Sequence, residues 1–357
     1  MDIATKISKI QQVGEEILTL EELKTLLETK SKPIAYDGFE PSGKLHIAQG
    51  ILRAINVNKM TSTGVHFKMW VGDWFAWMNN KMGGDLDAIH KVGEYQIEVW
   101  KASGMDMNKI EFLWASDVMN DREYWKKVVN IARENSLPRI IRCAQIMGRS
   151  ETDTLSAAQI FYPCMQCADV FHLNADITQL GMDQRKVNVL AREIAPKLGY
   201  KKPVVVSHHM LLGLEEPKIK DTSVDAKIEM KMSKSKPNSA IFMTDNQEEI
   251  TQKIKKAYCP EKQIEFNPIL EYYKYILFET QKTITLNKPA KFGGPVTYAT
   301  YTELEKDYVK GNIHPLDLKN TASELLNQLV EPVRTHFEKN AKARKLKEFI
   351  DQQTVTR

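Results

Sequence analysis

Short apolar segments alternate with longer segments of helical periodicity through most of the first 210 residues, and this alternation constrains the fold most strongly. Four segments have the composition of β-strands, namely residues 33–36, 65–71, 109–114 and 203–208. The intervening residues have helical spacing, as at Ile47, Ile51, Ala54 and Ile55, and again over residues 122–135. Strands separated by helices build βαβ units. The sequence therefore predicts an α/β fold with a doubly wound, Rossmann-like parallel sheet.

The character of the sequence changes near residue 240. Downstream segments such as 248–258 and 322–349 are helical in pattern and rich in lysine, and they contain no strand of the buried kind. A chain of 357 residues is also long for one compact core. We therefore expect a larger α/β domain over residues 1–240 and a second, mainly α-helical domain over residues 241–357.

The composition is that of an ordinary globular protein, with 42% hydrophobic residues, 27% charged residues and a formal net charge of +4. Residues 1–27 mix acidic and basic side chains along an amphipathic helix, unlike a secretion signal or a transit peptide. No apolar stretch approaches the roughly 20 residues of a membrane helix. We expect a soluble, cytoplasmic protein that does not associate with a membrane.

Four cysteines are too few for a disulfide framework in a chain of this length. Cys164 and Cys167 form a CxxC motif with His172 nearby, which raises the possibility of zinc. No second pair of ligands stands at a matching spacing. We expect the two thiols to be helix-packing residues, with no protein-bound metal.

The first segment with chemical potential is YDGFEPSGKLHIAQG, residues 36–50. A strand is expected to end at Tyr36, a turn follows, and His46 is expected to open the next helix. Ligands bind at such a point in doubly wound sheets, because a helix N-terminus offers free N–H groups and a positive dipole end to phosphate. A histidine there can donate to a phosphoryl oxygen as negative charge grows on it. The alternative is a turn with an incidental histidine.

The second segment is YPCMQCADVF, residues 162–171. Tyr162, Gln166 and Asp169 are spaced i, i+4 and i+7, so they project from one face of a helix whose first turn suits Pro163. The other faces are apolar, which predicts a largely buried helix. Buried polar groups must find partners. This polar stripe therefore either contacts a ligand or forms an internal hydrogen-bond network.

Two loops complete the set. In GMDQRK, residues 181–186, Gly181 would let the backbone approach a sugar or purine, Asp183 could accept from ribose hydroxyls, and Gln184 could add an amide, although Gly-x-Asp is also common in turns. In KMSKS, residues 231–235, Lys231 and Lys234 stand in what we expect to be an exposed loop.

Residues 46–50, HIAQG, resemble the HIGH signature of class I aminoacyl-tRNA synthetases, and residues 231–235 match their KMSKS signature. The chain is similar to the tyrosyl-tRNA synthetases of the eukaryotic and archaeal branch through seven segments in family order: YDGFEPSG, RCAQIMGRSE, YPCMQCADV, GMDQRKVNVLARE, KMSKS, KFGG and HPLDLK. Ala48 and Gln49 depart from HIGH, so the second histidine is absent and its role must fall to another group. The chain stops near Arg357, which resembles the minimal form of the family.

The resemblance implies a tyrosine-tRNA ligase that joins L-tyrosine to ATP, releases pyrophosphate, and transfers the tyrosyl group to the 3′ end of tRNA(Tyr). Its tyrosine-binding residues would be Tyr36, Tyr162, Gln166, Asp169 and Gln184, with the substrate phenol between Tyr36 and Asp169. The catalytic residues would be His46, Lys231 and Lys234. ATP, accompanied by Mg²⁺, would contact Gly38, His46, Gly50, Gly181, Asp183, Lys231, Met232, Ser233, Lys234 and Ser235.

The resemblance also implies that residues 1–240 are the catalytic domain and that the helical domain binds the anticodon. Phe292, His314 and Asp317 would contact anticodon bases, and Arg185 would contact the first acceptor base pair. A core phenylalanine and an N-cap aspartate are the alternatives. The family implies a homodimer, expected to pair through residues 113–160, where IIRCAQIM would offer apolar surface. A tryptophanyl enzyme and a catalytically idle RNA-binding or signalling relative remain the rival functions.

Overall fold

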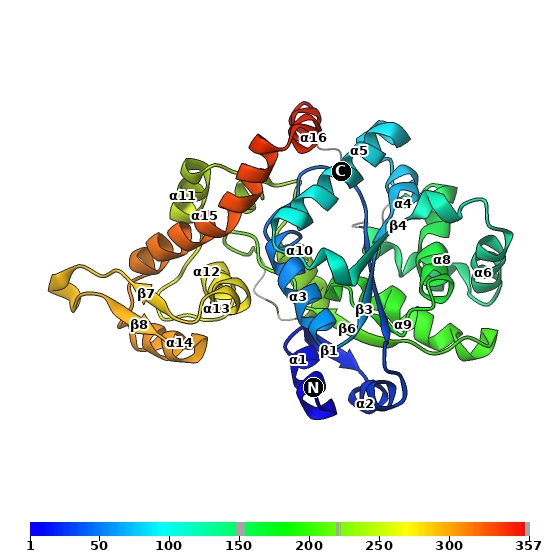
Figure 1. Ribbon diagram of the computed structural model, residues 1–357, viewed down its shortest axis with the longest axis horizontal. Coiled ribbons are helices and arrows are strands. Elements are labelled where there is room, and N and C mark those ends of the chain that lie inside the picture. The colour runs from blue at the N-terminus through cyan, green and yellow to red at the C-terminus, as the bar shows by residue number, and fades with distance from the viewer. Residues whose placement is uncertain (148–153, 219–220, 222, 354–357) are drawn as a thin grey trace.

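The computed structural model describes residues 1–147, 154–218, 221 and 223–353. A six-stranded sheet with the order β1-β6-β5-β2-β3-β4 forms the centre of the larger domain (Figure 1). Its strands are β1 Gly14–Leu18, β2 Ile34–Phe39, β3 His66–Val71, β4 Ile110–Trp114, β5 Ile177–Thr178 and β6 Val204–His208. All neighbouring pairs are parallel except β1 with β6. The predicted doubly wound α/β fold is confirmed, with one antiparallel strand at its edge.

Helices cover both faces of this sheet because alternate strand residues point to opposite sides. Phe67 and Met69 belong to one buried cluster with α3 (Ile51–Ser62) and α5 (Leu86–Ala102). Trp70 belongs to a second cluster, which is formed with α6 (Arg122–Arg133), α8 (Ala157–His172) and α9 (Arg185–Ile194). The larger domain also contains α2 Leu20–Thr29, α4 Asp73–Met78, α7 Leu137–Ile141 and α10 Val224–Met230.

The single helix expected over residues 1–27 is wrong. The chain instead forms α1 (Ile3–Gln11), the edge strand β1 and then α2. β1 pairs with β6 over Glu16 to Leu18, and Thr19 then starts α2 with a capping box to Glu22. Backbone hydrogen bonds to the sheet edge thus replace the helix that the local pattern favours.

Two further local expectations need correction. The helix after the first motif begins at Ile51 and not at His46, because residues 46–50 turn to meet residues 241–243: His46 forms an antiparallel bridge with Phe242. Helix α8 begins at Ala157, where Ser156 caps it, so Pro163 lies inside the helix and not in its first turn. The first residues of both helices are determined by contacts that helical periodicity in the sequence does not reveal.

The second part of the chain is mainly helical (Figure 1). It contains α11 Gln247–Lys256, α12 Pro268–Tyr272, α13 Phe278–Thr280, α14 Tyr301–Lys310, α15 Pro315–Lys339 and α16 Ala341–Asp351. A hairpin of β7 (Ile284–Leu286) and β8 (Val296–Tyr298), which the sequence did not predict, lies at the end of the molecule far from α6 and α8. Within the described ranges, no helix combines the length and apolarity needed to span a lipid bilayer.

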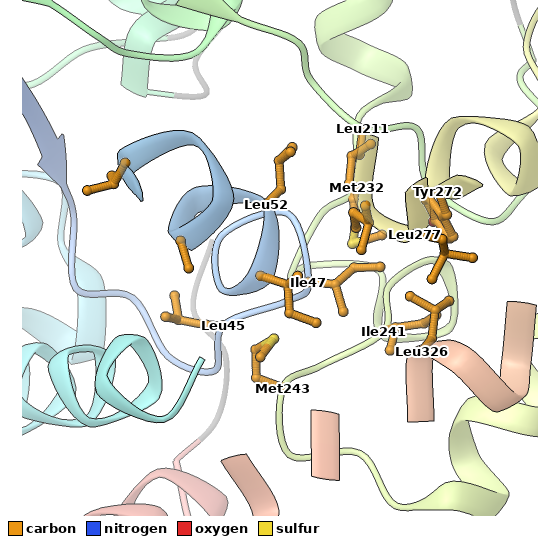
Figure 2. Close-up of a cluster of buried hydrophobic side chains, with 14 of the residues drawn as sticks. Leu45, Ile47, Leu52, Leu211, Met232, Ile241, Met243, Tyr272, Leu277 and Leu326 are labelled. Carbon is orange, nitrogen blue, oxygen red and sulfur yellow. The ribbon is translucent and has the colours of Figure 1, made fainter. Parts of the chain in front are cut away.

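The segment just beyond the predicted boundary at residue 240 joins the two parts. The Ile47 N–H donates to the Ile241 carbonyl at 2.9 Å, and the Met243 N–H donates to the Leu45 carbonyl at 2.9 Å. Figure 2 shows these four side chains in one buried cluster. The HIAQG segment, residues 46–50, is therefore held in place by residues almost 200 positions away in sequence.

Candidate active site

A cleft of about 1110 Å³ opens at the carboxyl ends of β2 and β5. The strand order reverses between these two strands, which is where doubly wound sheets bind ligands. The cleft brings together most of the predicted site residues from four separate segments: Tyr36, Gly38, His46, Tyr162, Gln166, Asp169, Gly181, Asp183, Gln184, Lys231, Met232, Ser233, Lys234 and Ser235.

The deepest polar group is the Asp169 carboxyl, on α8. Asp169 and Tyr36 are each 1% exposed. Asp169 Oδ1 accepts a hydrogen bond from the Tyr124 hydroxyl at 2.8 Å. Burial raises the pKa of Asp169 well above its usual range, and the Tyr124 hydrogen bond opposes that rise. A carboxyl in this environment strongly favours a hydroxyl donor beside it.

Gly38 matters here for space. A Cβ at position 38 would lie 3.2 Å from the Tyr36 hydroxyl, so a residue larger than glycine would crowd the part of the cleft beside Tyr36.

Amide and carboxylate groups line the middle of the cleft. The Gln166 side chain donates to Gln184 Oε1 at 2.9 Å, which fixes both amides. The Tyr162 hydroxyl donates to Glu40 Oε2 at 3.1 Å, and Lys81 lies 3.6 Å from the same carboxylate. The polar stripe on α8 therefore lines the cleft and forms internal hydrogen bonds, while its contact with a ligand stays a prediction.

The imidazole of His46 lies beside the lysine loop. It is 6% exposed, and its Nδ1 makes no hydrogen bond within the described residues. Burial, and then the charges of Lys234 and Lys231, lower the pKa of His46 well below its usual range. The ring is neutral and carries one N–H, which it can donate.

Lys234 enters the cleft from the KMSKS segment. Its ammonium donates to Ser42 Oγ at 3.2 Å. Burial lowers the pKa of Lys234 to about 7; Glu40 acts against this change and Lys81 adds to it. A nearby phosphate would raise the pKa of Lys234 again, so the neutral amine would regain its proton there.

Lys231 and Asp183 form an ion pair with a separation of 2.5 Å between Nζ and Oδ2. Gly181 lies next to this pair, and a Cβ there would be 2.5 Å from Asp183 Oδ1 and from the Met210 sulfur. Only a glycine fits at this position while Asp183 keeps its orientation. The two loops identified separately in the sequence thus meet at one point.

Four predicted residues with described side chains do not line the cleft. Gly50 packs against Met243, whose sulfur would be 2.4 Å from an added Cβ. Arg185 pairs with Glu16 on β1 at 2.8 Å. His314 caps α15 by accepting from the Leu316 N–H, and Asp317 in the first turn of that helix is 9% exposed. The side chain of Phe292 lies outside the described part of the structure. The nucleic-acid roles of the last four stay predictions.

Four apolar residues of IIRCAQIM do not supply the exposed apolar surface that we expected there. Ile140, Cys143, Ile146 and Met147 are each 7% exposed or less, because they pack into the second buried cluster. Residues 148–153, which begin with the adjoining GRSE, lie outside the described residues. Cys164 and Cys167 are buried in the same cluster.

Sequence reasoning missed three contributors. Tyr124 reaches Asp169 from α6, and nothing near Tyr124 in sequence signals this. Glu40 stands inside the first motif, where a carboxylate four residues after Tyr36 was a usable signal. In the wall of the cleft, Arg53 pairs with the buried Asp37 at 2.7 Å.

Comparison with known proteins agrees with this geometry. Residues 28–331 match the family model for class I tRNA synthetases (W and Y). The chain is 53% identical to tyrosine-tRNA ligase 1, cytoplasmic, of Arabidopsis thaliana, over 100% of this chain and 90% of that protein. It is 42% identical to the tyrosine-tRNA ligase of Thermococcus kodakarensis, over 95% and 96%. The tyrosyl-tRNA synthetase of Pyrococcus horikoshii, solved with L-tyrosine, superposes with a TM-score of 0.91 at 39% identity and covers 98% of this chain and 100% of that one.

Proposed function

The chain belongs to the class I tyrosyl-tRNA synthetases and is a tyrosine-tRNA ligase, and from this premise we propose how its cleft performs the reaction. The observation that carries the assignment of roles is the convergence of Asp169, His46, Lys231 and Lys234 on one cleft.

The slot between Tyr36 and Asp169 receives the phenol of L-tyrosine. The buried carboxyl of Asp169 accepts the substrate hydroxyl, while the Tyr36 hydroxyl lies on its other side. Phenylalanine would offer no hydroxyl to Asp169 Oδ2, which makes no hydrogen bond within the described residues, or to the Tyr36 hydroxyl, at a cost of about 1–3 kcal/mol for each group. A tryptophan indole is a larger ring with its donor elsewhere, so the same slot disfavours it.

The ammonium and carboxylate of tyrosine lie toward Tyr162, Gln166 and Gln184. Glu40, which already accepts from Tyr162, supplies negative charge for the ammonium. Since the amides of Gln166 and Gln184 are fixed by each other, the substrate meets an oriented surface, and these two side chains lose little further entropy when it binds.

Activation forms a bond between a tyrosine carboxylate oxygen and the α-phosphorus of ATP, while the bond to the leaving pyrophosphate breaks. Positioning and charge stabilisation dominate such a transfer. His46 donates its N–H to a phosphoryl oxygen, and Lys231 and Lys234 stabilise the pyrophosphate as charge develops on it. Gly181 and Asp183 hold the ribose. In the second step a terminal ribose hydroxyl of the tRNA attacks the activated carbonyl, loses its proton, and AMP leaves.

Mg²⁺ belongs to this proposal as a companion of ATP. The described residues contain no cluster of three or more histidine, cysteine or carboxylate side chains suited to a metal. The ligands of the ion would therefore be phosphate oxygens and water, as is usual for Mg²⁺ carried by a nucleotide.

The helical domain is proposed to bind the anticodon through Phe292, His314 and Asp317, with Arg185 at the acceptor end. Lys288 donates to the Asn312 carbonyl at 3.1 Å, so the segments that carry KFGG and HPLDLK adjoin. We also propose a homodimer, and a cytoplasmic location that follows the name of the Arabidopsis relative.

The test is exchange of labelled pyrophosphate into ATP, measured separately with tyrosine, phenylalanine and tryptophan. We expect exchange with tyrosine and at least tenfold less with the other two, as the loss of one or two buried hydrogen bonds predicts. Exchange driven best by tryptophan, or by no amino acid, would contradict the proposal. Charging of tRNA(Tyr) by the same preparation tests the second step.

A further inference from the structure

The root of the KMSKS segment is a short antiparallel pairing with residues that follow β6. The Met232 N–H donates to the Leu211 carbonyl at 2.7 Å, the Gly213 N–H donates to the Met230 carbonyl at 2.9 Å, and Leu212 bridges Lys231. The position of Leu212 therefore determines where Lys231 and the residues beyond it begin.

Leu212 is itself held by helix α12 of the second domain. Its N–H donates to Glu271 Oε2 at 2.9 Å, and its carbonyl accepts from the Tyr272 hydroxyl at 3.1 Å. Tyr272 is fully buried, and the Glu271 side chain is 19% exposed. Two consecutive residues of one helix thus satisfy both backbone groups of a single residue, which is a stringent geometric restraint.

Charge strengthens this connection. The His209 ring lies between two carboxylates. Its Nδ1 is 3.0 Å from Oε2 of Glu15 on β1, and its Nε2 is 3.1 Å from Oε1 of Glu271. The ring also stacks on Tyr275, with 4.3 Å between the ring centroids. The two carboxylates raise the pKa of His209 to about 9 against the effect of burial, so the ring is a cation at neutral pH. Segment 209–212 is therefore tied to both domains.

Apolar packing completes the anchor. Met232, the second residue of the signature, is 3% exposed. Figure 2 shows its side chain next to Leu211, in the same buried cluster as Tyr272 and Leu277 of the second domain. The loop consequently has one fixed end, while Ser233 to Ser235 face the cleft.

We propose that Glu271 and Tyr272 are positioning residues for adenylate formation: from the helical domain they fix Leu212 and Met232, and thereby set where Lys231 and Lys234 meet the pyrophosphate. The inference rests on the proposed role of these lysines. It assigns a part in amino-acid activation to a domain otherwise assigned to the anticodon, because a catalytic group on a loop is only as well placed as the element that anchors it.

The test uses Tyr272→Phe, which deletes one hydroxyl and keeps the buried ring. We expect single-turnover adenylate formation to slow roughly three- to tenfold, the rate equivalent of one net hydrogen bond, with the Kd for tyrosine unchanged. Glu271→Ala should act in the same direction. Glu271→Gln keeps an acceptor for the Leu212 N–H and should recover most of the lost rate.

The matched control is Tyr273→Phe. This neighbour makes an equivalent bond, from its hydroxyl to the Leu318 carbonyl at 2.9 Å, but on the side of the helix that faces α15. A slowed Tyr272→Phe beside an unaffected Tyr273→Phe supports the inference. Equal rates in both variants and the parent, or equal losses in both, overturn it. If the parent itself shows no tyrosine-dependent exchange, the proposed function fails, which is a separate result.

Discussion

Replacing Lys234 by arginine should change the pH dependence of ATP use in a direction that the structure fixes. Burial lowers the pKa of Lys234 from 10.5 to about 7. At 1.36 kcal/mol per unit, this corresponds to about 5 kcal/mol against the charged form. The group therefore loses its proton in the folded protein as pH rises through about 7, while the unfolded chain keeps it to beyond pH 10.

The magnitude follows from the protonated fraction. With a pKa of about 7, roughly half of the Lys234 side chains are charged at pH 7 and roughly 1% at pH 9. If only the charged form assists pyrophosphate departure, kcat/KM for ATP, which reports the free enzyme, should fall about 50-fold over this interval. An arginine stays charged throughout. Lys234→Arg should lower kcat/KM for ATP at pH 7, because a planar guanidinium does not reproduce the compact charge of an ammonium. The same variant should flatten the pH profile above pH 7.

The assay is tyrosine-dependent pyrophosphate exchange at subsaturating ATP between pH 6.5 and 9. Titration of the substrate ammonium and of the triphosphate is common to parent and variant, so the ratio of the two profiles isolates Lys234. At saturating ATP the parent should fall less steeply, because the phosphates restore the proton. Parallel profiles for the parent and Lys234→Arg would refute the reasoning.

Three further outcomes are expected. Asp169→Ala should erase the preference for tyrosine over phenylalanine, a loss of about 10- to 100-fold in the ratio of their kcat/KM values; an unchanged ratio removes that assignment. Gly93→Ala should lower the unfolding free energy by about 1–2 kcal/mol in urea titrations, because the new Cβ would lie 2.6 Å from the Trp114 ring, and overpacking outweighs the gain in helix propensity; equal or greater stability contradicts this. Asp317→Ala should charge anticodon-altered tRNA and tRNA(Tyr) more equally than the parent does, and parental selectivity counts against the anticodon role.

Strands β2, β3, β4 and β6 and the polar stripe of α8 could be predicted because their patterns arise from local geometry. Tyr162, Gln166 and Asp169 share a helix face at any helix start, so the wrong start at Pro163 did not affect the proposed tyrosine pocket. The KMSKS lysines could be predicted only through family resemblance, since a lysine pair in a polar loop is by itself uninformative.

The features that could not be predicted from the sequence depend on pairing between residues that are far apart in the chain. β1 forms because β6 offers a free edge, and residues 46–50 leave the helical path because residues 241–243 bond to them. Tyr124 contacts Asp169 across 45 residues, and the Arg53–Asp37 pair forms between a strand and the following helix. Hydrophobic pattern identifies which faces are buried but not which polar groups meet inside.

On the proposed assignments, the same carboxylates that pair with lysines in this structure are the partners of the substrates. Asp183 holds Lys231, and Glu40 lies near Lys234 and within 3.6 Å of Lys81. Ribose hydroxyls that donate to Asp183 release Lys231, and a tyrosine ammonium that pairs with Glu40 draws that carboxylate away from Lys234. Both cations then turn to the phosphates. Because Asp183 gains hydrogen bonds and Glu40 gains an ammonium as the lysines turn to the phosphates, no carboxylate or lysine is left without a partner, and the lysines reach the pyrophosphate only when both substrates are bound.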